Sequence, residues 1–239
     1  MIKAVILAAG KGTRMKSDKP KVVHQVMGRP MVHYSIKAAK DAGADKVCVI
    51  VGYKADEVKA VIDEEVSYAL QEEQLGTGHA VKCAADFIGN EGDVIILCGD
   101  TPLVKGETLK KALWGHRRNG NGVTVISAIL DDPFGYGRII RDENGLARIV
   151  EQKDADEGEQ KVCEVNSGMY VFNCSALLKA LDMISNDNAQ GEYYLPDTIE
   201  IIKNMGMRVD AVPMDNANEI LGVNTLEQLK AAEDIMKER

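Results

Sequence analysis

Five basic side chains and two glycines crowd into one short loop near the start of the chain. The basic residues are Lys11, Arg14, Lys16, Lys19 and Lys21, and the loop directly follows an apolar run at residues 4–9. Guanidinium and ammonium groups bind phosphate oxygens, and glycines let backbone N–H groups approach a phosphate closely. The loop therefore predicts a triphosphate site, and the alternative is a solvated basic loop without a ligand.

Two common phosphate-binding motifs fail at Met15 in this loop. The dinucleotide fingerprint GxGxxG and the P-loop GxxxxGK[ST] both require glycine where Met15 stands. A helix directly after the loop is also disfavoured, because the residue before Pro20 avoids the α region. We therefore expect a long basic loop rather than a helix start, and the missing glycine argues against an NAD-dependent enzyme.

Short runs rich in Val and Ile alternate with helical patterns through the first 130 residues. The expected strands cover residues 4–9, 47–51, 66–70, 94–98 and 123–129, and the expected helices cover 31–42, 55–62, 77–88 and 107–117. Continuous apolar strands separated by helices indicate a parallel sheet covered on both faces. We predict a doubly wound, mostly parallel, Rossmann-like α/β sheet, in which ligands bind at the carboxyl ends of the strands.

The pattern changes after about residue 130. Residues 135–138, 148–151 and 164–172 are typical of strands with little helix between them, and the polar stretch 153–161 is expected to be a loop. This predicts a small mixed or antiparallel annex beside the sheet. We expect one domain over residues 1–225, with a nucleotide-binding half at about 1–130 and a second half at about 131–225.

A helix is expected at the C-terminal end, over residues 226–239. Thr225 and Gln228 match a capping box at its start. The expected apolar face consists of Leu226, Leu229, Ala232 and Met236. The chain stops without a Gly or Pro terminator, so this helix is either a surface helix or a linker to a further domain.

Composition and charge exclude several classes of partner. The chain has 239 residues with 29 basic and 37 acidic side chains, which gives a formal net charge of −8. This argues against nucleic acid or an anionic membrane as the main partner, because both attract basic surfaces. The five cysteines show neither a CxxC pair nor zinc-ligand spacing, so free thiols in a reducing compartment are expected. The run at 4–9 is too short for a signal sequence or a membrane span, and we expect a cytoplasmic protein.

The first loop also has a more specific resemblance. Residues 7–15, LAAGKGTRM, together with Pro20 and Lys21, resemble the signature of the sugar-phosphate nucleotidyltransferases. Further stretches resemble one subfamily, the N-terminal uridylyltransferase domain of the bifunctional N-acetylglucosamine-1-phosphate uridylyltransferases (GlmU). They are QEEQLGTGHA (71–80), GDTPL (99–103), YGRI (136–139), EQKD (151–154), NSG (166–168), NAQGEYY (188–194) and GVN (222–224). Each motif is weak alone, but together they follow the subfamily's order along essentially the whole chain.

The resemblance implies a reaction of UTP with N-acetylglucosamine 1-phosphate that yields UDP-N-acetylglucosamine, a cell-wall peptidoglycan precursor, and pyrophosphate. The sugar phosphate would attack the α-phosphorus in line, so positioning and charge neutralisation would supply most of the rate. Arg14 would bind the β- and γ-phosphates, and Lys21 the attacking phosphate and the α-phosphate. Mg²⁺ would be the cofactor, held by Asp100 and Asn224. From the residues alone, Asn224 also fits a turn or a helix N-cap.

The same resemblance divides the substrate contacts between the two halves of the chain. It assigns the nucleotide to Leu7, Ala8, Ala9, Gly10, Gln71, Gly76, Thr77, Gly99 and Asp100. It assigns the sugar to Gly137, Glu151, Asn166, Tyr194 and Asn224. A carboxylate suits sugar hydroxyls, and an amide suits either an acetamide group or the uracil edge. His79 is expected to be a helix-face residue rather than an acid or base.

Two departures from the subfamily pattern bear on the substrate and on assembly. Gln152 stands where relatives often have His, beside the implied sugar contact Glu151. The subfamily's second domain is a trimer-forming, left-handed β-helix with acetyltransferase activity, and its hexapeptide repeats are absent from these 239 residues. We therefore expect no acetyl-CoA site, and a monomer that is either an excised domain or a monofunctional relative.

Two alternative functions stay open at this point. One is the same chemistry with glucose 1-phosphate as the sugar and UTP or dTTP as the nucleotide. The other is a domain that senses nucleotide without turnover, which predicts loss of Arg14, Lys21 or Asp100. All three residues are present.

Overall fold

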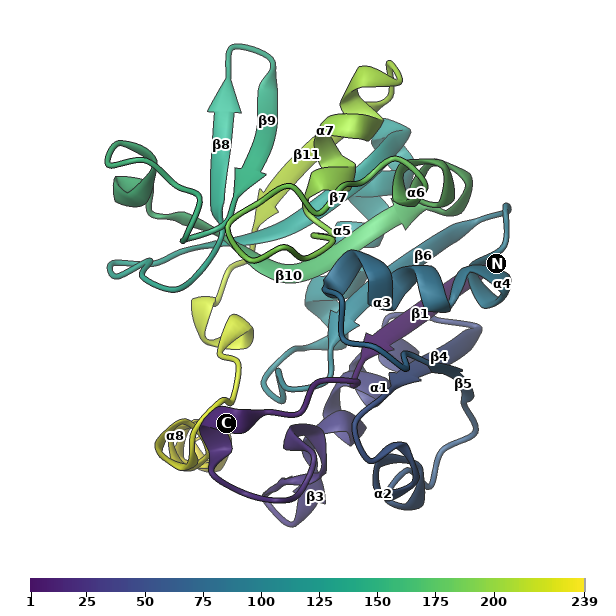
Figure 1. Ribbon diagram of the computed structural model, residues 1–239, viewed down its shortest axis with the longest axis vertical. Coiled ribbons are helices and arrows are strands. Elements are labelled where there is room, and N and C mark those ends of the chain that lie inside the picture. Colours follow the sequence, from purple (N-terminus) through teal and green to yellow (C-terminus); the bar gives the residue numbers. More distant parts are fainter. Residues whose placement is uncertain (239) are drawn as a thin grey trace.

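A mixed sheet with helices on both faces forms the centre of the molecule in the computed structural model, which describes residues 1–238 (Figure 1). Seven strands lie in one row, in the order β11 (Arg208–Pro213), β7 (Asn121–Ile129), β10 (Glu164–Asn173), β6 (Asp93–Cys98), β1 (Ile2–Leu7), β4 (Lys46–Val51) and β5 (Ser67–Leu70). Within this row of the described chain, only β10 runs against the others, since it pairs antiparallel with both β6 and β7. The predicted mostly parallel α/β sheet is confirmed.

The central strands are apolar because both faces of the sheet are covered. One face packs against α1 (Met31–Asp41) and α5 (Gly106–Asn119), with Ile36 and Leu109 fully buried. The other face packs against α3 (Thr77–Cys83), α6 (Cys174–Leu181) and α7 (Asp197–Asn204), where Leu177 and Ile199 are fully buried. Burial on both sides explains why these strands show continuous apolar runs instead of alternation.

Several boundaries differ from the sequence expectations. β1 ends at Leu7, so Ala8 and Ala9 belong to the following loop although both are buried. The helix expected over 77–88 is divided into α3 and α4 (Ala85–Ile88), because Ala84 leaves helical geometry at φ −97° and ψ 15°. The helix expected over 55–62 is shorter, since α2 (Ala55–Ala60) ends at Ala60.

The annex is a hairpin that projects from the start of β10. Its strands are β8 (Arg138–Asp142) and β9 (Gly145–Val150), and Arg138 pairs with Val165 of β10 (Figure 1). The strand expected at 135–138 is wrong, because Gly135 adopts φ +86° and turns the chain, so the strand begins at Arg138. The sequence expectations also missed α6, α7 and β11, the elements that return the chain to the sheet.

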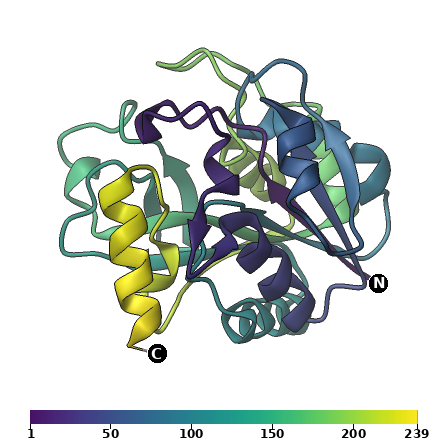
Figure 2. The ribbon, with the colours of Figure 1, turned by 90° about the horizontal axis from the view of Figure 1, so that it is seen from below.

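The C-terminal helix α8 (Leu226–Lys237) begins with the predicted capping box. The Thr225 side chain accepts a hydrogen bond from Gln228 N, and Gln228 Oε1 accepts one from Asn224 N at 2.8 Å. Ala232 is buried, but Leu226 is 57% exposed, so its expected place on the buried face is wrong. Figure 2 shows α8, in yellow, along one side of the molecule, where it contacts β2 (Gln25–Val26) of the short β2–β3 hairpin.

The hairpin partner β3 (Arg29–Pro30) leads directly into α1.

Among residues 1–238, none of the helices combines the length and the apolar composition needed to span a bilayer.

Candidate active site

The first loop leaves the sheet at the carboxyl end of β1 and is tied to its neighbours by backbone hydrogen bonds. Ala8 N donates to Ile50 O at 2.9 Å, and Tyr53 N donates to Ala9 O at 3.0 Å. On the other side, Gly99 N donates to Leu7 O at 2.9 Å. The start of the loop is therefore held at the strand edge where a parallel sheet binds its ligands.

The side chain of Met15 holds the middle of the loop by packing into the interior of the protein. Its side chain is 1% exposed and belongs to an apolar cluster with Val26, Leu103, Val223 and Ala232. The residue that breaks both common phosphate motifs therefore fixes the loop to the α8 side of the molecule. In the sequence, Met15 is a mismatch to both motifs, and the signal for its buried position is an apolar residue between the charged residues Arg14 and Lys16.

A close backbone approach sets the relative position of the two ends of the loop. Gly12 has φ +68°, and a Cβ on it would lie 2.5 Å from Lys21 Cβ. Only glycine allows this conformation together with this contact. Lys21 begins the short 3₁₀ helix η2 (Lys21–Val23) and directs its ammonium group toward the carboxyl end of β6.

Four predicted residues from distant parts of the chain meet in one polar cluster. Lys21 Nζ contacts Asp100 Oδ2 in an ion pair and donates to Asn224 Oδ1 at 2.9 Å. The Arg14 guanidinium donates to the same Asn224 oxygen at 2.9 Å. Val223 N donates to Asp100 O at 2.9 Å, which joins the segment before α8 to the loop after β6. The cluster therefore combines two cations with two oxygens that face the same point.

A pocket of 270 Å³ opens beside this cluster. Its lining includes the predicted nucleotide contacts Leu7, Ala8, Ala9, Gly10, Gln71, Gly76, Thr77 and Asp100, together with Lys21. Gly99 does not line the pocket, and a Cβ there would lie 3.0 Å from Leu7 O, so its position is set by strand packing. Gln74 and Glu192 also line the pocket and were missed, although both stand inside quoted motifs.

Gln71 is buried at the end of β5, and its amide is oriented from two sides. Nε2 donates to Gly76 O at 3.1 Å and lies 3.1 Å from His79 Nδ1. His79 is on α3, as expected, and it positions an amide of the pocket wall. Gly76 adopts φ +109°, and a Cβ on it would lie 2.6 Å from Tyr193 O, so the loop requires glycine there.

A second pocket of 220 Å³ adjoins the first and shares the lining residues Leu7, Thr77 and Cys98 with it. It contains three of the predicted sugar contacts, Gly137, Glu151 and Asn166. The lining residues that were not predicted from the sequence include Gly135, Tyr136, Ser167, Gly168, Tyr170, Leu195 and Pro196. Tyr136, Ser167 and Gly168 lie in the quoted YGRI and NSG stretches, whereas Tyr170 follows a register shift in β10 between Asn166 and Met169.

The Asn166 side-chain amide forms two hydrogen bonds with other residues that line the pocket. Nδ2 donates to Tyr170 OH at 2.7 Å, and Oδ1 accepts from Gly168 N at 3.0 Å. Its backbone N also donates to Gly137 O at 2.8 Å, which ties β10 to the start of the hairpin. One amide N–H and one oxygen lone pair remain for a ligand.

Glu151 brings a partly buried carboxyl group to the same pocket. Burial raises its pKa, the carboxylates of Asp154 and Asp197 raise it further, and Arg138 opposes them. A Cβ on Gly137 would lie 3.1 Å from Glu151 Oε1, so the carboxyl group lies against the backbone at that glycine. The site can therefore present a carboxyl acceptor to hydroxyl groups in a partly desolvated space.

Gln152 supports the pocket without lining it. Its Oε1 accepts hydrogen bonds from Arg138 at 2.7 Å and from Gly135 N at 2.9 Å. Arg138 is 1% exposed and also donates to Tyr136 O. The residue that departs from the subfamily pattern therefore braces the turn at 135–138.

Two further predicted sugar contacts lie outside both pockets. Tyr194 is buried, and its hydroxyl accepts from Gln190 Nε2 at 2.7 Å. Asn224 belongs to the cation cluster and does not line the second pocket. Tyr194 lines neither pocket, whereas its neighbours Glu192 and Leu195 line the first and the second pocket, respectively.

The most similar curated relatives include three proteins named "Bifunctional protein GlmU". The chain is 54% identical over 237 residues to that of Caldanaerobacter subterraneus subsp. tengcongensis, and 50% identical over 238 residues to those of Clostridioides difficile and Bacillus subtilis. Each match covers 99% of this chain and 52% of the relative. The chain thus spans about half the length of the curated relatives it matches.

Solved structures support the fold. A putative glucose-1-phosphate thymidylyltransferase from Bacillus anthracis matches with a TM-score of 0.82, over 100% of this chain and 96% of that one. A UDP-glucose pyrophosphorylase complexed with UDP-glucose matches with a TM-score of 0.78 over both full chains. Both are 18% identical to this chain, so they bear on the fold alone.

The family model described as "Nucleotidyl transferase" matches residues 3–218, a range that contains both pockets and the loop that carries Arg14 and Lys21. The resemblance inferred from the sequence motifs is thus confirmed at this level: the chain belongs to the nucleotidyl transferase family.

Proposed function

We propose that this chain is a uridylyltransferase that converts UTP and N-acetylglucosamine 1-phosphate into UDP-N-acetylglucosamine and pyrophosphate. The observation that carries the proposal is the cluster of Arg14, Lys21, Asp100 and Asn224 beside two adjoining pockets. The high identity to relatives named GlmU supports this choice among nucleotidyltransferases. The seven quoted stretches of the sequence also resemble the uridylyltransferases of that subfamily.

Arg14 and Lys21 supply the positive charge for the phosphates. Arg14 is exposed at the outer edge of the cluster, which suits the β- and γ-phosphates and the departing pyrophosphate. Lys21 lines the nucleotide pocket and is half-buried, which suits the α-phosphate and the attacking phosphate. Neither acts as a base, because a phosphate monoester already presents an oxyanion as the nucleophile.

Asp100 and Asn224 fit a magnesium ion. Asp100 Oδ2 and Asn224 Oδ1 both contact Lys21 Nζ, so two oxygens of the type that Mg²⁺ prefers converge on one cationic group. Nucleotidyltransferases of this family are typically metal-dependent. Bound there, Mg²⁺ would neutralise phosphate charge. With only one charged ligand, we expect the ion to bind together with the nucleotide.

The remaining residues orient the base and the sugar. Gln71 presents an amide whose orientation is set by Gly76 and His79, and an amide can pair with the imide edge of uracil. Glu151 accepts hydrogen bonds from sugar hydroxyls, and Asn166 has one N–H and one lone pair free for the acetamido group. We further propose that the chain works as a cytoplasmic monomer, in line with five cysteines that are all free.

A substrate matrix tests the proposal. Pyrophosphate release would be measured with Mg²⁺ and each pairing of UTP or dTTP with N-acetylglucosamine 1-phosphate or glucose 1-phosphate. We expect the highest kcat/KM for UTP with the N-acetylated sugar. Preference for glucose 1-phosphate would overturn the sugar assignment at Asn166, and preference for dTTP would overturn the base assignment at Gln71. Release with none of the four pairings would contradict a nucleotidyltransferase activity of the chain.

A further inference from the structure

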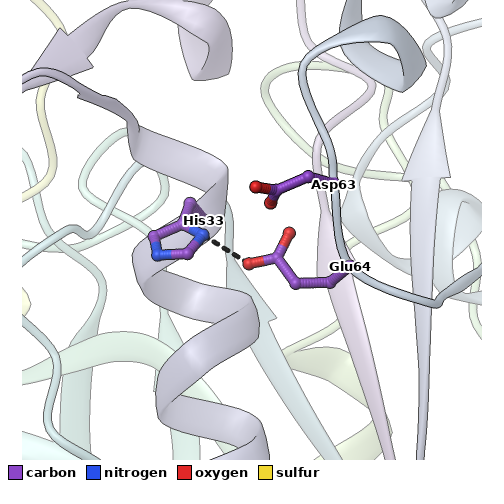
Figure 3. A group of neighbouring side chains, drawn as sticks. All are labelled: His33, Asp63 and Glu64. Carbon is purple, nitrogen blue, oxygen red and sulfur yellow. Dashed lines mark ion pairs between the residues drawn. The ribbon is translucent and has the colours of Figure 1, made fainter.

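A second cluster of potential metal ligands lies away from the cluster of Asp100 and Asn224, on the face of the sheet covered by α1. His33 is in the first turn of α1, and Asp63 and Glu64 lie in the segment between α2 and β5 (Figure 3). One ligand atom from each residue lies within 4.8 Å of the other two. The cluster therefore joins two segments about thirty residues apart, and the reaction assigned above uses neither of them.

The polar atoms of this cluster are poorly satisfied by the protein. His33 Nδ1 faces Glu64 Oε1 as an ion pair (Figure 3), whereas Glu64 Oε2 is shielded from solvent without a hydrogen-bond partner. Burying a polar atom without a partner is costly. A bound ion would satisfy this oxygen.

Two acidic groups also meet at this point. One carboxylate oxygen of Asp63 and one of Glu64 lie within 4.8 Å of each other, so two negative charges are held close together. Arg29 is the ion-pair partner of Asp63, with its guanidinium 3.5 Å from Asp63 Oδ2, and both side chains are largely exposed. A screened surface pair of this kind contributes little, so a further positive charge is favourable here.

We propose that His33, Asp63 and Glu64 bind one divalent transition-metal ion, of which Zn²⁺ suits the donors best. One imidazole nitrogen and two carboxylate oxygens are typical ligands of Zn²⁺, with water in the remaining position. Mg²⁺ and Ca²⁺ are disfavoured, because both prefer an all-oxygen set. The exposed Asp63 leaves the ion accessible from solvent.

The position of the site gives it a structural role. The ion would join α1 to the segment that follows α2, and both helices contact η2, the element that begins with Lys21. Binding to the folded chain alone would stabilise it. The inference is independent of the substrates proposed above, since none of the three ligands lines either pocket.

Calorimetric titration of the full chain with Zn²⁺ tests the site. The titration would use a Cys163→Ser background and excess Mg²⁺, because Cys163 is the exposed thiol and Asp100 could also attract Zn²⁺. We expect one saturable site and a higher melting temperature with Zn²⁺. His33→Gln and Glu64→Gln should each weaken binding by more than the roughly 10–100-fold that loss of an outer-shell partner costs.

Asp41→Asn is the matched control, since it removes one exposed carboxylate from the same helix, where Asp41 pairs with Lys37. This control should bind Zn²⁺ as the parent does. Asp63→Asn should also weaken Zn²⁺ binding. Because Asp63 is exposed, this variant should fold, and it still tests the site if the His33 or Glu64 variant does not fold. No saturable Zn²⁺ binding, or equal binding by the parent and these ligand variants, would show that the cluster is an ion pair only.

Discussion

The two pockets are built in different ways, although they share an edge. The first pocket lies at the carboxyl ends of parallel strands and is lined largely by small residues, with one cation, Lys21, from the short helix η2. The second pocket is lined by side chains of the antiparallel strand β10 and of the turns around the β8–β9 hairpin, and it contains the partly buried carboxyl group of Glu151. Charge in the first pocket is therefore paired, Lys21 with Asp100, whereas the Glu151 carboxyl group in the second lies near further carboxylates that raise its pKa.

This difference predicts how substitutions act. Removing the ammonium group of Lys21 from the first pocket should reduce turnover much more than stability. In the second pocket, electrostatics and folding are coupled, because a buried carboxyl group costs stability when it ionises. The following predictions test that division, from the largest expected effect to the smallest.

Lys21→Ala should reduce turnover by about 10²–10³-fold, the usual cost of one donor at a developing charge. The unfolding free energy should fall by only about 1–2 kcal/mol, since Asp100 loses its partner but stays partly hydrated. Pyrophosphate release and thermal melting measure the two effects. Lys19→Ala, an exposed lysine of the same loop, should leave turnover nearly unchanged. Normal turnover in Lys21→Ala would contradict the role of the cluster.

Met15→Ala tests whether the loop needs its apolar anchor. The side chain is 1% exposed, so its truncation should cost about 2–4 kcal/mol of stability through lost burial and a cavity. Turnover should also fall, because the adjacent Arg14 loses its fixed backbone. Denaturant unfolding and kinetics at saturating substrate check both effects. Met15→Leu should retain most of the stability and most of the turnover. Unchanged stability in Met15→Ala would show that the loop does not need the buried Met15 side chain.

Glu151→Gln should raise KM for the sugar phosphate by about tenfold, with a smaller change in KM for UTP, since it removes one charged acceptor. In the parent chain, burial raises the pKa of Glu151, so its carboxylate is lost at a higher pH than an ordinary Glu loses it. KM for the sugar phosphate should therefore rise as the pH falls through a range above the ordinary glutamate pKa of 4.5. Because the phosphate itself also titrates there, the Glu151→Gln profile is the reference, and identical profiles for both chains would contradict the assignment.

Asp197→Asn should stabilise the fold by about 1 kcal/mol at pH 8. Burial, with Asp154 and Glu200, raises the pKa of Asp197 from 3.8 to about 6 in the folded chain. As the pH rises above 4, the Asp197 carboxyl group ionises in the unfolded chain but stays protonated in the folded chain, which favours unfolding. This cost to the folding free energy grows until about pH 6, where the folded chain ionises as well, and is constant at higher pH. The gain from the variant should therefore disappear below pH 4. Melting curves at pH 4, 6 and 8 check this, and equal gains at all three values would contradict it.

Local sequence patterns determined much of the architecture. The apolar strands, the crossover helices, the interruption before Pro20 and the Thr225 capping box all depend on neighbouring residues, so they could be predicted without the fold. Most of the lining of the first pocket could also be predicted from residues at strand ends, because the carboxyl ends of parallel strands meet at one edge.

The tertiary structure alone decided the features that depend on packing between distant segments. It placed β10 between β6 and β7, and it left Tyr194 outside both pockets. It also buried Met15 under α8 and brought Asn224 to Lys21 across 203 positions of the chain. Such contacts depend on which apolar faces cover one another and on where the chain returns to the sheet, and hydrophobic periodicity and capping signals carry no information about either.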